Sequence, residues 1–307
     1  MNLRNKLEEQ YILKTLQLAQ KAAGRTGINP LVGAVVVKNG VVVGKGYHKK
    51  EGAPHAEIEA LRQAGRQAAG GQLFVNLEPC CHYGKTPPCT DAIIAGGVRK
   101  VVVGMRDPNP LVNGRGIRIL KRNGIEVAAG VLRNECERVN EVFSKYIRAG
   151  VPFVILKTAI SLDGKIATRS GESQWISGEP SRKRAHQLRD RVDAVMVGAG
   201  TVLKDDPRLT VRLNRKKANH PLRVILDNRH RVPLTAKVFQ NAPEQKVIYV
   251  AATHLPPARE RQLNRMGVDI CFVKEKNGKI DLRQLMRLLG KRKVTSLLIE
   301  GGGQVNA

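Results

Sequence analysis

One histidine, one glutamate and two cysteines restrict the fold of this chain more than any other feature of its sequence. His55 and Glu57 are two positions apart, Cys80 follows a proline, and Cys89 lies further along the chain. One imidazole and two thiolates can hold a zinc ion by three bonds and leave the fourth tetrahedral position open for water. The fold must therefore bring separate segments together, and we predict His55, Cys80 and Cys89 as metal ligands.

Glu57 is the predicted proton carrier of this site. The pattern H-x-E followed by P-C-x-x-C is typical of zinc deaminases that act on bases, and its glutamate is a general acid/base. Here the histidine half fits, but eight residues separate Cys80 from Cys89 where the pattern has two. On a regular helix His55 would face Glu59 rather than Glu57. We favour Glu57 if His55 lies at the very start of a helix, and we expect Glu59 to face solvent.

The alternative is a closed structural zinc site with Cys81 or His82 as the fourth ligand. Cys136 and Cys271 have no metal-binding neighbours in sequence and are expected to be buried. Five cysteines are an odd number, which argues against a disulfide framework and favours a reducing compartment. The sequence has no apolar run long enough to cross a membrane and no signal-peptide core at its start. We therefore expect a cytoplasmic protein.

The charge of the chain indicates an anionic partner. Lysine and arginine number 53 against 26 acidic residues, which gives a net charge of +27. Nucleic acid, phosphorylated small molecules and NADPH are all compatible with this balance. Aromatic residues make up only 4% of the chain, so few side chains are available for stacking on bases, and nucleic acid is the less favoured partner.

Apolar periodicity predicts an α/β protein in two parts. Helices are expected over 3–23, 55–65, 89–94, 116–123 and 134–148, and strands over 34–37, 41–43, 73–77, 101–103 and 125–128. The sequence Asn39-Gly40 predicts a hairpin between the first two strands. Gly150-Val151-Pro152 divides the chain, and further strands are expected over 153–156, 194–197, 223–226, 246–250, 269–272 and 296–299. Alternation of this kind is typical of a largely parallel sheet.

Two glycine turns mark the second half of the chain. Gly198-Ala199-Gly200-Thr201 and Glu300-Gly301-Gly302-Gly303 each follow a strand-like run. Such turns let backbone N–H groups approach a pyrophosphate, although neither has the G-x-G-x-x-G pattern and each alone could be an ordinary tight turn. Lys157 is expected in an apolar strand, where a buried lysine needs a partner or an anion. Trp175, the one tryptophan, is expected in the core.

Longer motifs in the first half resemble one known family. They are Asn29-Pro30-Leu31-Val32-Gly33, His55-Ala56-Glu57, the run from Glu78 to Cys89, and Met105-Arg106-Asp107-Pro108-Asn109-Pro110. Together they are similar to the deaminase half of the bifunctional riboflavin-biosynthesis deaminase/reductase family. The two cysteines are far apart in that family, as they are here, so the insert supports the resemblance.

Motifs in the second half are similar to the reductase half of the same family. They are Leu156 to Ala167, Gly171 to Ile176, Gly200-Thr201-Val202 and Asp205 to Arg212. The resemblance implies a cytidine-deaminase-like three-layer domain over residues 1–150, a dihydrofolate-reductase-like α/β domain over residues 151–307, and zinc and NADPH as cofactors. Family members continue past the glycine turn at Glu300, so we expect the reductase domain to be incomplete at its C-terminus.

The resemblance also implies which residues bind ligands. The deaminase substrate would contact Asn29, His48 and Lys85, and the reductase substrate would contact Ser173, Arg189, Leu209, Arg212 and Glu300. NADPH would contact Ala159, Trp175, Thr201, Asp205, Asn228 and the turn at Gly302 and Gly303. Lys157 and Asp205 are the candidate charged groups near the carbon that is reduced.

The activity that the resemblance implies has two steps. The first is hydrolytic deamination of 2,5-diamino-6-ribosylamino-4(3H)-pyrimidinone 5′-phosphate, and the second is reduction of its ribosyl group to ribityl by NADPH. Three alternatives stay open: a zinc deaminase acting on tRNA, a basic binding module with a structural zinc, and a deaminase whose reductase half is inert. A homo-oligomer is expected if the C-terminus is complete.

Overall fold

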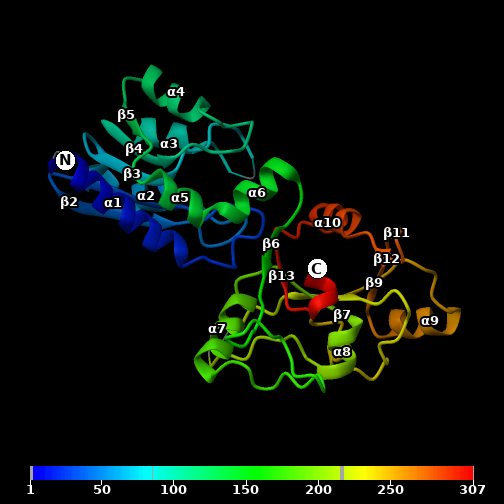
Figure 1. Ribbon diagram of the computed structural model, residues 1–307. Helices are drawn as coiled ribbons and strands as arrows, with labels where there is room; N and C mark the ends of the chain where they lie inside the picture. Colours follow the sequence, from blue (N-terminus) through cyan, green and yellow to red (C-terminus); the bar gives the residue numbers. More distant parts are fainter. Residues whose placement is uncertain (1–2, 85, 215–217, 307) are drawn as a thin grey trace. The chain divides into compact units, whose positions relative to one another are not determined.

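The computed structural model describes residues 3–84, 86–214 and 218–306, with side chains from residue 5 onward (Figure 1). The chain divides into two compact units, Met1–Ala149 and Gly150–Ala307. Across the described residues, no helix combines the length and the apolar character needed to span a membrane.

The first unit has a five-stranded sheet in the order β2-β1-β3-β4-β5. These strands are β1 (Gly33–Lys38), β2 (Val41–Tyr47), β3 (Gln72–Leu77), β4 (Lys100–Met105) and β5 (Glu126–Ala129). β1 is antiparallel to β2 and β3, whereas β3, β4 and β5 are parallel. The predicted hairpin is confirmed: Asn39 and Gly40 both have positive φ, 51° and 78°, as a two-residue turn of this kind requires.

Helices cover both faces of this sheet. They are α1 (Leu3–Gln20), α2 (Ala56–Ala64), α3 (Cys89–Ala95), α4 (Arg115–Arg122), α5 (Arg133–Val139) and α6 (Glu141–Ala149), with a short 3-10 helix, η1 (Gly65–Ala68). A Cβ at Gly33 would meet the backbone of α1, whereas a Cβ at Gly44 or Gly46, on the other face, would meet that of α2. These glycines allow close helix–sheet packing, and the result is a three-layer unit.

One prediction in the first unit is wrong. The single helix expected over 134–148 is two consecutive helices, α5 and α6, separated at Asn140 (Figure 1). The other expected helices and strands of this unit are present, with ends that differ by a few residues. The central strand β4 is buried along its whole length because helices cover both of its faces.

The second unit has a parallel six-stranded sheet in the order β10-β9-β8-β7-β13-β6. The strands are β6 (Phe153–Leu156), β7 (Ala194–Gly198), β8 (Leu222–Leu226), β9 (Val247–Ala251), β10 (Asp269–Phe272) and β13 (Ser296–Ile299), all at predicted places. The two faces carry separate apolar clusters: Val195 and Ile225 belong to one, Met196 and Val224 to the other. This alternation places the core of the unit on both sides of the sheet.

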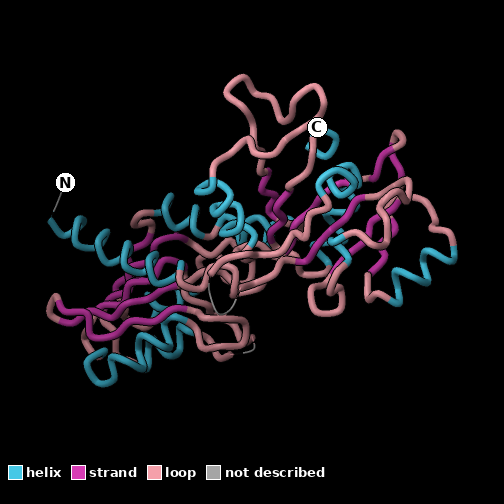
Figure 2. Tube along the Cα trace, turned by 90° about the horizontal axis from the view of Figure 1, so that it is seen from below, coloured by secondary structure: helices cyan, strands magenta, loops and turns pink. Residues whose placement is uncertain are grey.

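The helices of the second unit were not predicted. They are α7 (Glu179–Arg189), α8 (Ala199–Asp205), α9 (Pro257–Arg265), α10 (Leu282–Lys291) and α11 (Gly303–Asn306), with a 3-10 helix, η2 (Lys237–Phe239), and a small hairpin of β11 (Glu275–Lys276) and β12 (Lys279–Ile280). A long loop connects β6 to α7, and the described residues between α8 and β8 are also loop (Figure 2).

Two residues of the second unit are not where the sequence analysis placed them. Lys157 follows β6, which is the edge strand of the sheet, and it is half-buried rather than enclosed in an apolar strand. Trp175 is 70% exposed and stacks under the guanidinium of Arg182, whose centre lies 4.5 Å from the ring. The predicted core position of Trp175 is therefore wrong, and both residues line a cleft described below.

Candidate active sites

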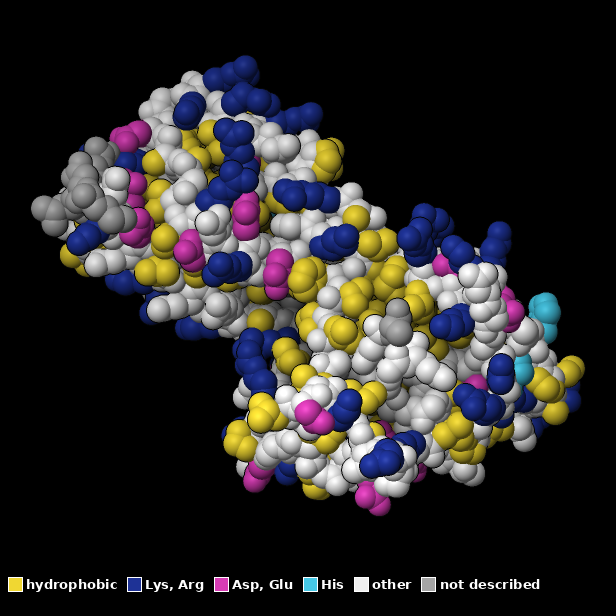
Figure 3. Space-filling view, viewed as in Figure 1, with side chains coloured by type: hydrophobic (Ala, Val, Ile, Leu, Met, Phe, Trp, Pro, Cys, Tyr) yellow, Lys and Arg dark blue, Asp and Glu magenta, His cyan; other side chains and the backbone are white. Residues whose placement is uncertain are grey.

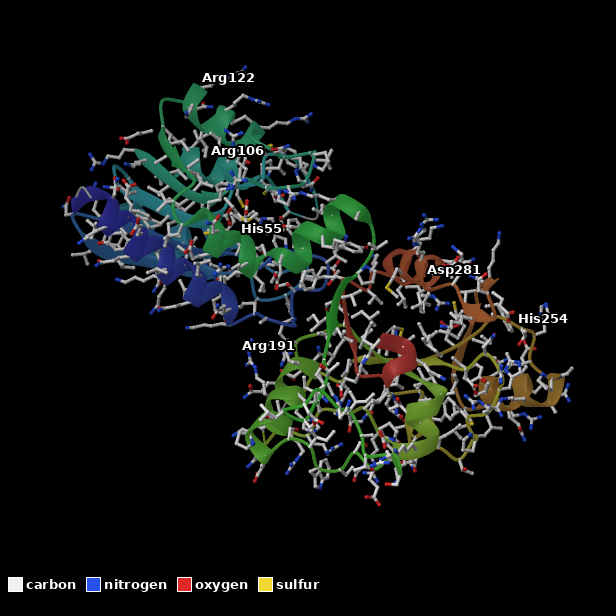
Figure 4. The ribbon with its side chains drawn as sticks, viewed as in Figure 1. His55, Arg106, Arg122, Arg191, His254 and Asp281 are labelled. Atoms are coloured by element: carbon white, nitrogen blue, oxygen red, sulfur yellow. The ribbon has the colours of Figure 1, made fainter. Side chains whose placement is uncertain are left out.

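Three secondary-structure junctions bring the predicted metal ligands together inside the first unit. Figure 4 labels one of them, His55. His55 occupies the N-cap position of α2, Cys80 lies just after β3, and Cys89 is the first residue of α3. The Nδ1 atom of His55 lies 3.1 Å from Cys89 Sγ and 3.5 Å from Cys80 Sγ. Helix N-termini favour thiolates because of their partial positive charge.

These three donors fit a zinc ion. Bond lengths of about 2.0–2.1 Å to nitrogen and 2.3 Å to sulfur place neighbouring tetrahedral ligand atoms roughly 3.5 Å apart. The distances from His55 to the two sulfurs are close to this value. A hydrogen bond from Cys89 lowers the pKa of the Cys80 thiol, and the same contact raises the pKa of Cys89. A dication between the two sulfurs would stabilise both thiolates.

Glu57 faces the site and has an atom available for chemistry. His55 has extended backbone angles, φ −70° and ψ 161°, so the regular helix begins only after it. His55 therefore lies at the very start of the helix, which is the condition under which Glu57 rather than Glu59 is expected to face the metal site. Glu57 is 3% exposed, and among the described residues its Oε2 atom has no hydrogen-bond partner. Glu59 instead lies toward the surface, where it pairs with Arg62 and Lys49.

Burial changes the acidity of Glu57. Loss of water around the carboxyl raises its pKa to about 7, and the nearby Cys80 thiolate adds to this effect. A carboxyl with a pKa near the operating pH both accepts and donates a proton readily, as a general acid/base must.

Asn29 and His48 lie beside the ligands and are joined to each other. The rings of His48 and His55 are 5.4 Å apart, edge to face. His48 Nδ1 lies 3.3 Å from the carbonyl oxygen of Pro54, and Nε2 lies 3.1 Å from Asn29 Nδ2. Since a carbonyl only accepts and an amide nitrogen only donates, His48 is protonated on Nδ1 and accepts at Nε2. This arrangement leaves Asn29 Oδ1 as an acceptor for an N–H or O–H group of a ligand.

The insert between the cysteines is described in part. Lys85, predicted to contact the substrate, lies outside the described residues. Thr86 Oγ1 lies 3.4 Å from His55 Nε2. The closed-site alternative gains no support, because His55, Cys80 and Cys89 are the one convergent group of possible ligands in the described part of the chain. The thiol of Cys81 points instead to the carbonyl oxygen of Leu111, at 3.9 Å.

Glu78 is a structural residue of the site that the sequence analysis did not single out. Its side chain is 2% exposed and accepts backbone hydrogen bonds from Asp107, Gly114 and Ile117, at 3.2, 2.8 and 3.1 Å. Three donors compensate for burial of the carboxylate. Glu78 thereby ties the segment after β4 to the start of the Cys80 loop. Its position directly before Pro79-Cys80 was the available signal.

A cleft of about 1210 Å³ in the second unit brings together every residue predicted for the reductase. It is lined by Lys157, Ala159, Ser173, Trp175, Arg189, Thr201, Asp205, Leu209, Arg212, Asn228, Glu300, Gly302 and Gly303. Both glycine turns border it because β7 and β13 are parallel neighbours and end at the same sheet edge. Each turn leads into a helix, α8 or α11.

The cleft fits a ligand with several phosphates. A Cβ at Gly200 would meet no atom within 4 Å, so the first turn borders open space. The lining contains more basic than acidic side chains; the basic ones are Lys157, Arg182, Arg189, Lys204, Arg208, Arg212, Arg229, Arg231, Lys237 and Lys279, and the acidic ones are Asp205, Asp206, Asp227 and Glu300. A cationic cleft with glycine turns suits the pyrophosphate of a dinucleotide.

Arg189 and Glu300 form a pair that the sequence could not show. Two nitrogens of Arg189 contact the two carboxylate oxygens of Glu300 at 2.6 and 2.8 Å, and Arg189 Nη1 also donates to the carbonyl oxygen of Thr210 at 3.1 Å. The two side chains are 12% and 7% exposed. This planar, bidentate contact fixes both residues at the floor of the cleft.

Several other predicted residues are held by the protein itself. The Asn228 amide donates to Glu275 and accepts from the backbone N–H of Ala252, and Thr201 Oγ1 accepts from the N–H of Gly302 at 3.2 Å. Leu209 is 2% exposed and packs in the core. These residues shape the cleft as much as they offer atoms to a ligand. Asp206 pairs with Lys237, at 3.1 Å.

Comparison with known proteins identifies both halves. The family description "RibD C-terminal domain" matches residues 152–307, and "Cytidine and deoxycytidylate deaminase zinc-binding region" matches residues 5–105. The second unit thus has the dihydrofolate-reductase-like fold of that domain, and the first has the cytidine-deaminase-like fold.

Full-length relatives agree with these matches. The chain is 43% identical over 296 residues to riboflavin biosynthesis protein RibD of Actinobacillus pleuropneumoniae, covering 96% of this chain and 78% of that protein. It is 46% identical over 296 residues to RibD of Aquifex aeolicus, with coverage of 96% and 81%.

Solved structures lead to the same conclusion. The diaminohydroxyphosphoribosylaminopyrimidine deaminase/5-amino-6-(5-phosphoribosylamino)uracil reductase of Thermotoga maritima has a TM-score of 0.86 and 40% identity, covering 98% of this chain and 83% of that one. RibD of Acinetobacter baumannii also has a TM-score of 0.86 and 40% identity, with coverage of 98% and 82%. With two matching units, a zinc-type ligand set and a dinucleotide-type cleft, this chain belongs to the RibD family of bifunctional riboflavin-biosynthesis deaminase/reductases.

Proposed function

We propose that the first unit, as a zinc-dependent deaminase domain, removes the exocyclic amine of 2,5-diamino-6-ribosylamino-4(3H)-pyrimidinone 5′-phosphate. The second unit, as an NADPH-dependent reductase domain, then reduces the ribosyl group of the product to ribityl. The observation that carries this proposal is the buried, unpartnered Oε2 atom of Glu57 beside three converging ligand atoms. Deamination and reduction in riboflavin biosynthesis are the activities of the family to which the chain belongs.

In the deaminase unit, the protein's own contribution is to hold the substrate and to move protons. His55, Cys80 and Cys89 would hold zinc, which when bound supplies the Lewis acidity that activates a water molecule. Glu57 takes a proton from the attacking water at Oε2 and delivers it to the departing ammonia. The carboxyl begins and ends in the same protonation state, so one residue serves the complete reaction.

Recognition of the substrate in this unit is assigned to Asn29, His48 and Lys85. His48 is 3% exposed, and burial lowers its pKa, so the ring is neutral near pH 7 and keeps Asn29 oriented. Asn29 Oδ1 would accept from a ring N–H or an amino group. Lys85 is assigned to the phosphate or ribosyl side, where a flexible cation suits a doubly charged group.

In the reductase unit, NADPH is proposed to lie along the two glycine turns. Its contacts are assigned to Ala159, Trp175, Thr201, Asp205, Asn228, Gly302 and Gly303, all on the cleft wall. The substrate is assigned to Ser173, Arg189, Leu209, Arg212 and Glu300. Lys157 and Asp205 are the titratable groups proposed to act near the reacting carbon.

A coupled assay tests both activities at once. The wild-type chain should release ammonia from the pyrimidine phosphate and then oxidise NADPH. Glu57→Gln should abolish ammonia release while NADPH oxidation persists on the deaminated intermediate, because the amide keeps the shape of the side chain but cannot carry the proton. Undiminished ammonia release by this variant would remove Glu57 from the mechanism.

The cellular compartment and the macromolecular partners of the chain are part of the same proposal. The five cysteines are free thiols, which agrees with a reducing compartment such as the cytoplasm. Lys and Arg side chains are spread over the visible face of both units rather than gathered on one of them, which does not favour a nucleic-acid surface (Figure 3). Self-association remains a prediction that sedimentation analysis would test.

A further inference from the structure

Two buried asparagines outside the ligand set hold the segment that carries Asn29. Asn76 lies in β3 and Asn140 lies between α5 and α6, and they are 0% and 1% exposed. We infer that Asn76 and Asn140 are positioning residues of the deaminase site, which act on the substrate through Asn29 and His48. The inference rests on the proposed role of Asn29.

The segment from Asn29 to Gly33 makes few hydrogen bonds to other backbone groups. It leads into β1, and Val32 accepts from the N–H of His48 at 3.0 Å. Its central residue, Leu31, is held by the two side chains instead. The N–H of Leu31 donates to Asn140 Oδ1 at 2.8 Å, and its carbonyl oxygen accepts from Asn76 at 2.9 Å and from Asn140 at 3.0 Å.

Asn76 makes a second bond to the same segment. Its Oδ1 atom accepts from the N–H of Gly33 at 2.8 Å. Each asparagine therefore supplies one donor and one acceptor to neighbouring peptide groups, a combination that only a carboxamide side chain offers in fixed geometry. Because both side chains are buried, loss of one of these bonds leaves a polar group with little access to water.

Through these bonds, Asn76 and Asn140 attach the segment that carries Asn29 to two other parts of the fold. Asn76 lies in the strand that leads directly to Cys80, so the segment carrying Asn29 and the loop carrying a metal ligand share one attachment. On its other side the segment is pressed against α1, since a Cβ at Gly33 would lie 2.1 Å from the carbonyl oxygen of Thr15. The break between α5 and α6 falls on Asn140 and supplies the second attachment.

Steady-state kinetics separate positioning from a merely structural role. In Asn140→Ala the segment loses two of its bonds. We expect the KM of the deaminase to rise roughly ten- to a hundredfold, since a misplaced Asn29 loses a hydrogen bond to the substrate and such a loss changes affinity by about this factor. Zinc per chain and NADPH oxidation on separately supplied deaminated intermediate should not change. Asn140→Asp keeps the acceptor, loses the donor and sets a charge against a carbonyl, so it should raise KM as well.

Asn123→Ala is the matched control. Asn123 is exposed at the end of α4 and makes one local bond, to the carbonyl oxygen of Ile119 at 2.9 Å. It should keep wild-type kinetics. If Asn140→Ala does not fold, the nearly isosteric Asn140→Asp provides the same readout.

A double-mutant cycle with Asn29→Ala completes the test. If Asn140 acts through Asn29, adding Asn140→Ala to Asn29→Ala should change KM by much less than it does alone. Fully additive effects, or a lower kcat with unchanged KM as expected for a smaller folded fraction, would overturn the inference. A wild-type chain that releases no ammonia would instead refute the proposed function, so the two failures are distinguishable.

Discussion

The Arg189–Glu300 pair tests whether burial makes an ion pair contribute strongly to the stability of the second unit. Glu300→Gln keeps the size of the side chain but removes its charge and one of the two acceptors that Arg189 contacts at 2.6 and 2.8 Å. Breaking a buried ion pair from one side costs about 3–5 kcal/mol. One bond to the amide oxygen and the bond to Thr210 remain, so we expect a loss of about 2–3 kcal/mol in the stability of the second unit.

The assay for this prediction is urea unfolding followed by circular dichroism, with ammonia release as the sign that the first unit is intact. The control is Glu137→Gln, which alters the exposed pair of Arg133 and Glu137, whose nitrogen and oxygen are 2.8 Å apart. An exposed pair of this kind contributes about 0.3–0.5 kcal/mol. Equal losses in the two variants would refute the claim that burial makes the first pair strong. Glu300→Gln should also raise the KM for the reductase substrate, because Arg189 would be held by fewer contacts.

Two further predictions follow from the structure. Tyr249→Phe removes a buried hydroxyl that donates to Asp227 Oδ2 at 2.8 Å, and should destabilise the second unit by about 1–2 kcal/mol. It should also raise the KM for NADPH, because Asp227 holds the turn that follows Asn228 through the N–H groups of Arg231 and Val232. An unchanged KM would show that this turn does not contribute to NADPH binding. Removal of zinc by a chelator should abolish ammonia release, and zinc should restore it. NADPH oxidation on the deaminated intermediate should be unaffected, and its parallel loss would contradict two independent sites.

Much of the fold is readable from the sequence because local patterns and tertiary structure agree. The β-branched runs at Val101 and Val195 become buried central strands, and Asn39-Gly40 becomes the turn it predicts. The helix α7 is different. It has no buried residue, so it carries no apolar stripe that a periodicity argument could detect.

The metal site was predictable because its chemistry restricts both residue types and spacing. Contacts between distant residues were not. Arg189 and Glu300 are 111 positions apart, and their pairing depends on strand order. The same dependence explains Lys157, since β6 is an edge strand and exposes residues that a central strand would bury. The helix break falls at Asn140, whose side chain contacts Leu31, 109 positions away.

Strand order in the second unit also has a consequence for how the protein is made. Within the described residues, β13 follows the other strands of the main sheet in sequence, yet it lies between β6 and β7, which are made much earlier. During synthesis on the ribosome, β6 therefore has to wait without its neighbour until residues 296–299 have emerged. Unpaired apolar strands are prone to aggregation while they wait. We expect nascent chains halted shortly before β13 to depend on chaperones for solubility, whereas the first unit, whose strands are all complete by residue 129, should fold while translation continues.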